Sequence, residues 1–180
     1  MMRAWLACGL FLGILGFVYA ENGAAREAMG RLTNKDTSVR RQAAQDLAEM
    51  GPEAKLATPA LRKALQDSDL FVRRFAALAL GKVGPGVPDA KDNVSALALA
   101  MNDSKKEVQL AAADGLLQMG PLSLNAFMAA LKDPNRDPAI RKKAAQGLAK
   151  IGPQARGALP TLTEMVTNAQ KMAKGKAMLN

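Results

Sequence analysis

Apolar residues recur in this chain in four stretches that share one spacing. In each, a β-branched residue is followed by Ala-Ala after four and five positions, by Leu after eight, by another apolar residue after eleven, and then by Gly-Pro. The stretches begin at Val39, Val72, Val108 and Ile140. Apolar residues at positions 0, 4, 8 and 11 lie on one face of a helix. The spacing therefore predicts four amphipathic helices, each ended by Gly-Pro, with a small Ala-Ala pair where a neighbouring helix can approach closely.

A second apolar segment follows each Gly-Pro, so each repeat is expected to hold two helices. In the first repeat this segment runs from about residue 52 to residue 66. Pro59 and Pro160 occupy equivalent places and either kink the second helix or lie in its first turn. The residues expected in the core are Leu56, Leu61 and Leu65 in the first repeat, and Leu159, Leu162, Met165 and Val166 in the fourth. The repeat starts are 33, 36 and 32 residues apart, and repeats of this length indicate stacked helical hairpins.

Polar residues mark the start of each first helix. Asp36, Asp69 and Asp137 stand three positions before the apolar start and are expected to cap the helix. Each also precedes an arginine by four positions, a spacing that stabilises an exposed helix by roughly 0.2–0.5 kcal/mol. These arginines are Arg40, Arg73 and Arg141. The third repeat differs, because Ser104 to Glu107 form a capping-box pattern and Gln109 replaces the arginine.

These motifs resemble the HEAT-repeat family, and specifically the short HEAT-like repeats of phycobilisome lyase subunits. The resemblance covers roughly residues 24–168 and rests on Val-Arg or Ile-Arg, the Ala-Ala-to-Gly-Pro run, and Ala-Leu-Pro at residues 158–160. It implies an all-α, right-handed α-solenoid of about four HEAT-like helical hairpins. In that family the aspartates and arginines bond between repeats, so we interpret the six named above as structural. The family's second helices line the concave side, which makes these residues candidates for binding a partner: Lys55, Arg62, Lys63, Lys91 and Gln154.

The first twenty residues are typical of a secretory signal peptide. Arg3 precedes a run of about fifteen apolar residues, and Val18-Tyr19-Ala20 fits a cleavage site. The run is short for a membrane span of about 20 residues, although an uncleaved anchor is the alternative. We expect export to the periplasm or the medium, with cleavage after Ala20. The organisation then expected is a capping half-repeat at 21–35, repeats at 36–67, 69–103, 104–133 and 137–168, and a basic tail at 169–180.

The residue types available restrict the chemistry. The sequence contains no histidine, and its one cysteine, Cys8, lies in the predicted signal peptide. Imidazole acid–base catalysis, histidine metal sites and thiolate nucleophiles are therefore excluded from the processed chain. Asp89 and Asp92 could bind a cation weakly, but carboxylates there more often complement a helix dipole. The sequence predicts a protein that is not an enzyme and that has no cofactor or metal.

The charge balance leaves several binding functions open. Lys and Arg number 25 against 16 acidic residues, a net charge of +9, and about +8 once Arg3 is removed. The expected function is that of an exported scaffold or adaptor for an unidentified protein partner. The first alternative is binding to an anionic polymer or membrane surface, with steep salt dependence. The second is an accessory subunit of a lyase-like or oxidoreductase system. Specific nucleic-acid binding is not expected, because Phe71, Phe75 and Phe127 fit core positions better than stacking platforms.

Overall fold

The computed structural model describes residues 23–165 and residue 167, and within these residues the chain forms helices and turns without any strand. The predicted signal peptide, Val166 and the basic tail lie outside this described part. No helix in the described part is long and apolar enough to cross a membrane. After a helix at 23–31, the elements are α2 (Thr37–Met50), η1 (Gly51–Ala57), α3 (Thr58–Ala64), α4 (Leu70–Val83), α5 (Ala90–Ala100), α6 (Lys106–Gln118), η2 (Gly120–Ser123), α7 (Leu124–Lys132), α8 (Pro138–Ile151) and η3 (Gly152–Ala158), with residues 159–165 again helical.

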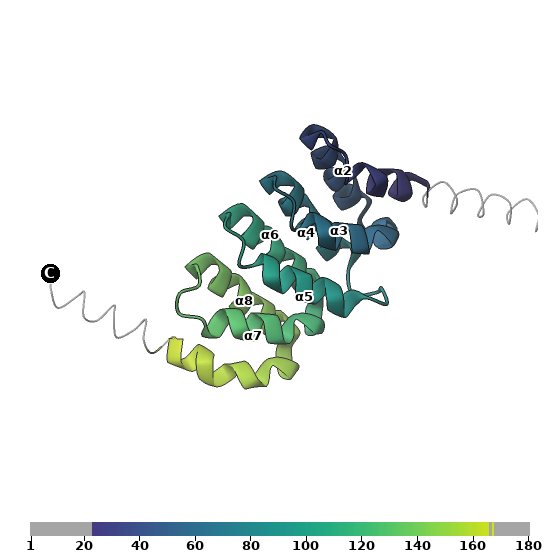
Figure 1. The fold of residues 1–180 in the computed structure, drawn as a ribbon. Coiled ribbons are helices and arrows are strands. Elements are labelled where there is room, and N and C mark those ends of the chain that lie inside the picture. Colours follow the sequence, from purple (N-terminus) through teal and green to yellow (C-terminus); the bar gives the residue numbers. More distant parts are fainter. Residues whose placement is uncertain (1–22, 166, 168–180) are drawn as a thin grey trace, which may run out of the picture.

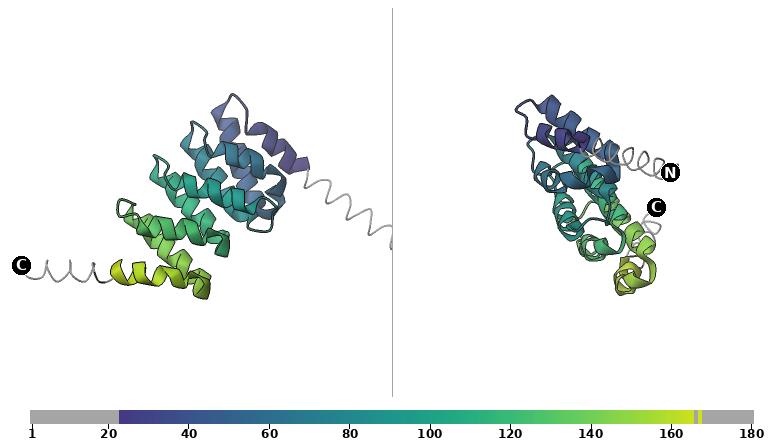
Figure 2. Two further views of the ribbon diagram at one scale, coloured as in Figure 1. Left: turned by 60° about the horizontal axis from the view of Figure 1, so that its bottom comes forward. Right: turned by 90° about the vertical axis from the view of Figure 1, so that its right-hand side faces the viewer.

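The helices form two layers that run the length of the molecule (Figure 1). The first-helix layer consists of α2, α4, α6 and α8, in which each helix contacts the next. The second-helix layer contains α3, α5 and α7, preceded by the helix at 23–31 and followed by the helix at 159–165. Residues 23 and 167 lie at opposite ends of the stack (Figure 2). The chain is thus an all-α solenoid of four hairpins, as the sequence predicted.

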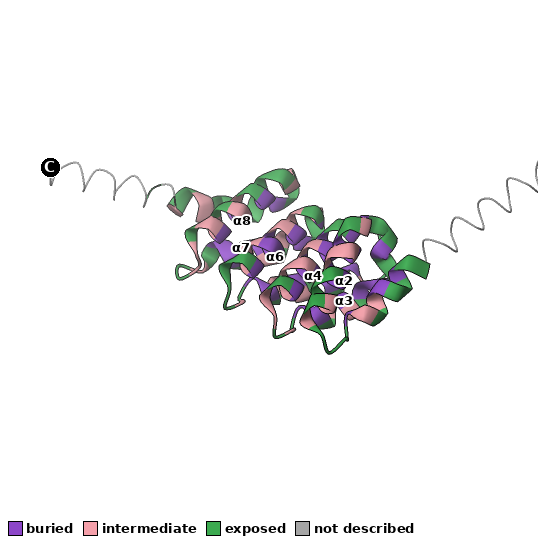
Figure 3. Ribbon diagram, turned by 90° about the horizontal axis from the view of Figure 1, so that it is seen from above, coloured by how far each residue is buried: buried purple, intermediate pink, exposed green. Residues whose placement is uncertain are grey.

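The apolar stripe of each first helix forms the core (Figure 3). The alanines of the first three Ala-Ala pairs and Ala144 are fully buried, whereas Ala145 is partly buried. Leu47, Leu80, Leu116 and Leu148 follow them into the core. Because each hairpin hides these residues against the next, its stability depends on its neighbours. The Ala-Ala prediction is confirmed.

Glycine ends each first helix in the left-handed region. The φ angles of Gly51, Gly84, Gly120 and Gly152 are 57°, 77°, 56° and 72°. In the first, third and fourth repeats a 3-10 segment starts at this glycine. Pro59 lies in the first turn of α3, and Pro160 likewise begins the helix at 159–165, so neither proline kinks a helix.

The 3-10 segments shift the helical phase, and this overturns two core predictions. Leu56 is 42% exposed and Leu159 is 58% exposed. The prediction placed these two leucines in the core by counting about 3.6 residues per turn, as in one continuous α-helix. The segments η1 and η3 instead complete a turn in about three residues. Leu61 and Leu65 are buried as predicted, and Leu162 and Met165 pack partly against the core.

The contact between neighbouring first helices depends on the ninth residue after the repeat start. In α4 this residue is Gly81, and a Cβ atom added to it would lie 2.4 Å from the Cα atom of Gly115 in α6. In α6 the same position holds Leu117, which lines a hollow of about 190 Å³ beside α8. There the ring of Phe127 from α7 packs against Gly147 of α8 instead. Glycine therefore joins α4 directly to α6, while an aromatic ring joins the last two repeats.

Candidate protein-binding face

Two arginines fasten the turns between hairpins. The Nε atom of Arg40 donates to Asp67 at 2.7 Å, and its Nη2 donates to the other carboxylate oxygen at 3.1 Å. Arg73 forms the same bidentate pair with Asp103, with its Nε atom donating at 2.6 Å and its Nη2 atom at 3.0 Å. The Nη1 of Arg73 also donates to the carbonyl of Asp67, so each arginine spans two successive turns. These bidentate pairs are mostly shielded from water and hold the hairpins in register.

Arg40 and Arg73 have the structural role that the sequence predicted, but their expected partners were wrong. Arg141 forms no ion pair within the described residues, and its buried Nε atom has no hydrogen-bond partner there. Arg40 and Arg73 pair with Asp67 and Asp103, in the turns after the second helices, and not with the aspartate four residues before each arginine. That aspartate is occupied by capping: Asp36, Asp69 and Asp137 accept backbone N–H groups of their own helices. Asp67 and Asp103 thus bind the two arginines, whereas the three capping aspartates bind their own helices; Asp69 and Asp137 also pair with Arg41 and Lys106.

The third repeat does not form the expected capping box. The N-cap of α6 is Lys105, which makes no side-chain cap, and its N–H donates to Asp103 at 2.8 Å. Gln109 is too short to span two turns and donates only to the Asp103 carbonyl, at 2.6 Å. Arg136 compensates by donating from the next turn to the Met101 carbonyl at 2.8 Å. In the third repeat, Arg136 therefore links the successive turns in place of an arginine at position 109.

Asp69 joins capping and bridging in one side chain. It accepts the N–H groups of Phe71 and Val72, and Arg41 of the preceding repeat donates to both of its oxygens at 2.9 and 2.6 Å. The hydrogen bonds from Arg41 are the main cause that lowers the pKa of Asp69 to about 2. Burial is the largest single influence on the pKa of Asp67 and of Asp103 and would raise both values, but the arginine bonds, a backbone N–H bond and the arginine charge together outweigh it and lower both.

We expect the protein to unfold more easily in acid. A carboxyl group with a depressed folded-state pKa adds stability above its unfolded pKa of about 3.9, and this stability is lost as the pH falls toward the folded value. For Asp69 that window runs from about 3.9 down to about 2. The Asp69→Asn variant, which keeps a good cap, should lose at most about 2 kcal/mol at pH 5 and little at pH 2. Urea unfolding at both pH values measures this, and an equal loss at both would contradict it.

Arg62, one of the candidate binding residues, is engaged within the solenoid. It pairs with Asp89 and donates to Asn93 at 2.7 Å, which ties α3 to α5. Thr58 donates to Asp89 at 2.9 Å. Burial would raise the pKa of Asp89, but the bonds from Arg62 and Thr58 lower it. The sequence analysis missed this polar cluster, and it gives Asp89 a partner inside the protein.

The exposed side of the second-helix layer changes character along the stack. Buried Leu61, Leu97 and Phe127 mark equivalent positions in α3, α5 and α7. The residues one position after these are Arg62, Ala98 and Met128, which are partly exposed. The residues two positions after them are Lys63, Leu99 and Ala129, which are exposed. Leu99 is 72% exposed, the most of any large apolar side chain in the described residues. The centre of this face is therefore apolar, whereas the first repeat is basic at the same positions.

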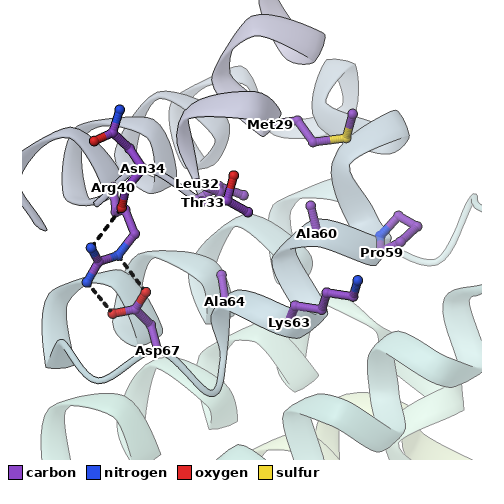
Figure 4. A pocket seen from close by; sticks show the side chains of 10 residues that line it. All are labelled: Met29, Leu32, Thr33, Asn34, Arg40, Pro59, Ala60, Lys63, Ala64 and Asp67. Atoms are coloured by element: carbon purple, nitrogen blue, oxygen red, sulfur yellow. Dashed lines mark hydrogen bonds and ion pairs between the residues drawn. The ribbon is translucent and has the colours of Figure 1, made fainter. Parts of the chain in front are cut away.

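A groove lies at the N-terminal end of the same face, between the helix at 23–31 and α3 (Figure 4). It encloses about 670 Å³. Met29, Leu32 and Ala60 form much of its floor, Lys63 reaches its edge, and the Arg40–Asp67 pair closes one end. We call this groove, together with exposed Leu99 and Ala129 and partly exposed Ala98 and Met128, the second-helix face.

The other candidate residues are spread over this layer. Lys55 in η1, Lys63 in α3 and Lys91 in α5 are exposed, and Gln154 is exposed in η3 at the far end of the stack. The structure brings Lys63 to the groove but does not gather all five residues into one site. The apolar centre at Leu99 was missed. This apolar centre could have been predicted from the sequence by comparing the same register position across the repeats, where Lys63 in the first corresponds to Leu99 in the second.

The three phenylalanines of the described residues differ in how far they enter the core, and Phe75 packs against it only partly. Phe127 is buried as expected, but Phe71 is 39% exposed beneath the guanidinium of Arg41, and Phe75 is partly exposed beside Arg74. Arginine over an aromatic face is a favourable pairing. In the residues that the structure describes, no group of three or more His, Cys, Asp or Glu side chains could hold a metal ion.

Comparison with known proteins agrees with this architecture. A family model described as HEAT repeats matches residues 27–100 and 94–177. No curated protein matches the chain. Among solved structures, one engineered protein is 25% identical with a TM-score of 0.59, over 78% of this chain and 67% of that chain. A second engineered protein is 23% identical with a TM-score of 0.55, over 79% of this chain and 73% of that chain. A third, also engineered and 23% identical, has a TM-score of 0.59, over 78% of this chain and 40% of that chain.

Proposed function

Since the chain belongs to the HEAT-repeat family, we propose that it is an exported, non-enzymatic scaffold that binds a protein partner through its second-helix face. The observation that carries this proposal is the exposed Leu99. The fold does not require a large apolar residue at this position, since it holds Lys63 in the first repeat and Glu164 in the fourth. An apolar side chain kept in water gains from a partner that covers it.

The surroundings of Leu99 fit the anatomy of a protein interface. Ala98, Met128 and Ala129 extend the apolar centre to the neighbouring helix, while Lys63, Lys91 and Lys132 supply an exposed basic rim. Interfaces commonly combine an apolar centre with a polar rim. The rim favours a partner whose own contact surface is acidic. The groove beside Met29 offers a recess for an apolar side chain of the same partner.

The test begins with affinity capture of the processed chain from the exported fraction and identification of a partner, followed by titration with the purified partner. We expect Leu99→Lys, which places the first-repeat residue in the second repeat, to weaken binding at least about tenfold, as loss of an apolar hot spot does. Gln118→Lys adds the same charge at an exposed site in α6, in the other layer, and should leave the affinity unchanged.

Salt dependence separates this function from attachment to an anionic polymer or membrane. Binding through the apolar centre should change little between low and moderate salt, whereas binding through the basic excess should weaken steeply. Equal affinity of wild-type and Leu99→Lys proteins, combined with a steep salt effect, would replace the proposed function with the electrostatic one.

A further inference from the structure

The first-helix layer carries a separate apolar patch in its two middle repeats. Its members are Phe71, Phe75 and Leu78 of α4 and Leu110 of α6. Phe71 is 39% exposed and the other three are partly exposed. Two of them, Leu78 and Leu110, line a hollow of about 300 Å³, whose other lining residues are Arg74, Glu107, Ala111 and Asp114. We call these four residues and the hollow the first-helix patch.

The outer repeats show that the fold does not require apolar residues at these positions. In the first repeat, the residues equivalent to Phe75 and Leu78 are Gln42 and Gln45, which bond to Asp46 and Glu49 on the surface of α2. In the fourth repeat they are Lys143 and Gln146. Polar residues therefore suffice to build this face of the solenoid. The change to phenylalanine and leucine occurs in the second repeat, and in the third repeat Leu110 replaces the basic residue that the other repeats have at its position. These partly exposed apolar side chains call for something that covers them.

The charges beside the hollow are complementary to each other. Arg74 stands on the α4 side and Glu107 on the α6 side, and within the described residues neither forms an ion pair. Arg40, Arg41 and Arg73, by contrast, each hold an aspartate. Asp114 is occupied by Lys143. Arg74, whose guanidinium lies beside the ring of Phe75, and Glu107 thus flank the same apolar recess on two neighbouring helices, and neither has an ion-pair partner within the described residues.

We propose that the first-helix patch binds a second copy of this chain. A two-fold axis that runs along the helices, between α4 and α6, lays α4 of each copy over α6 of the other. Arg74 of each copy then meets Glu107 of the other, and the apolar side chains meet between these two pairs. A two-fold interface requires such self-complementarity, since each contact occurs twice. The occupant is therefore defined by charge as well as by apolarity.

The size of the patch predicts a weak dimer. Helices of 13 and 14 residues are about 20 Å long, and packed neighbours lie about 8–10 Å apart. Together they present roughly 400 Å², half of the roughly 800 Å² per partner in a standard interface. We therefore expect dissociation in the micromolar range, populated at high local concentration. Such a dimer leaves the second-helix face of both copies open.

Sedimentation equilibrium tests the proposal over concentrations from low to several hundred micromolar. The full chain is produced in an exporting host, so that any processing of its N-terminus takes place. We expect Arg74→Glu and Glu107→Arg each to weaken the dimer at least tenfold, and the double exchange to restore it, because the pair is then reversed. Phe75→Gln with Leu78→Gln, the first-repeat residues, should also yield monomers.

The matched control is Leu99→Lys, which should leave dimerisation unchanged while it weakens partner binding. Circular dichroism confirms that each variant is folded. A wild-type chain that stays monomeric over the whole range would overturn the proposal, as would a folded charge-exchange double variant that remains monomeric. Either result leaves the proposed function of the second-helix face untouched.

Discussion

Gly81→Ala should destabilise the protein by about 3 kcal/mol, near the top of the usual range for overpacking a core. The added Cβ would lie 2.4 Å from the Cα atom of Gly115, and the atom in its way belongs to backbone. A flexible side chain could rotate away, but two packed helices have to separate. Urea unfolding followed by circular dichroism gives the change in the free energy of unfolding.

Gly30→Ala is the matched control for this substitution. Gly30 lies in the helix at 23–31, and nothing lies within 4 Å of the position that an added Cβ atom would take. Alanine there should stabilise the protein by about 0.5–1 kcal/mol, because glycine loses more backbone freedom in a helix. If both substitutions stabilised the protein, α4 and α6 would not be in the close contact that we describe.

Phe127→Ala should have the largest effect of the substitutions considered, a loss of about 4 kcal/mol. The ring is 1% exposed and fills the space that Gly147 leaves in α8. Its removal takes away the main apolar contact between α7 and the last repeat and opens a cavity next to the existing hollow. Hydrogen exchange should show that protection is lost first in α8.

Leu99→Ala provides the comparison, since it removes a large apolar side chain from the same layer. Leu99 is 72% exposed, so its truncation should change the free energy of unfolding by no more than about 0.5 kcal/mol. A large loss in this control would mean that Leu99 supports the fold, and would weaken its assignment to a binding surface.

The sequence was sufficient to predict the helices and most of the core, because both depend on local periodicity. Ala-Ala, Leu and Gly-Pro recur in register, and the structure places them as expected. The errors occur where the local period changes. Leu56 and Leu159 were assigned to the core by α-helical spacing, but Leu56 lies within the 3-10 segment η1 and Leu159 directly follows η3, and both side chains are turned outward.

Contacts between distant residues were harder to predict. Arg40 has acidic neighbours in sequence on its own helix, yet it binds Asp67, 27 residues away. A single repeat gives no indication of this choice, because it depends on the path of the turn that follows α3. The exposed apolar centre at Leu99 was missed for a related reason. An exposed leucine in one helix is common, and Leu99 becomes informative only beside Lys63 in the same register.

The contact between Gly81 and Gly115 also means that the four repeats are not interchangeable units. Deletion of the second repeat would bring α2 against α6, with Ala48 at the place of Gly81 and its methyl group directed at the Gly115 backbone. Joining α4 to α8 instead would meet glycine again, since Gly147 occupies the register of Gly115. The order of these modules, in evolution or in the laboratory, therefore decides how closely neighbouring first helices can approach, since α4 presents glycine at this contact and α2 presents Ala48.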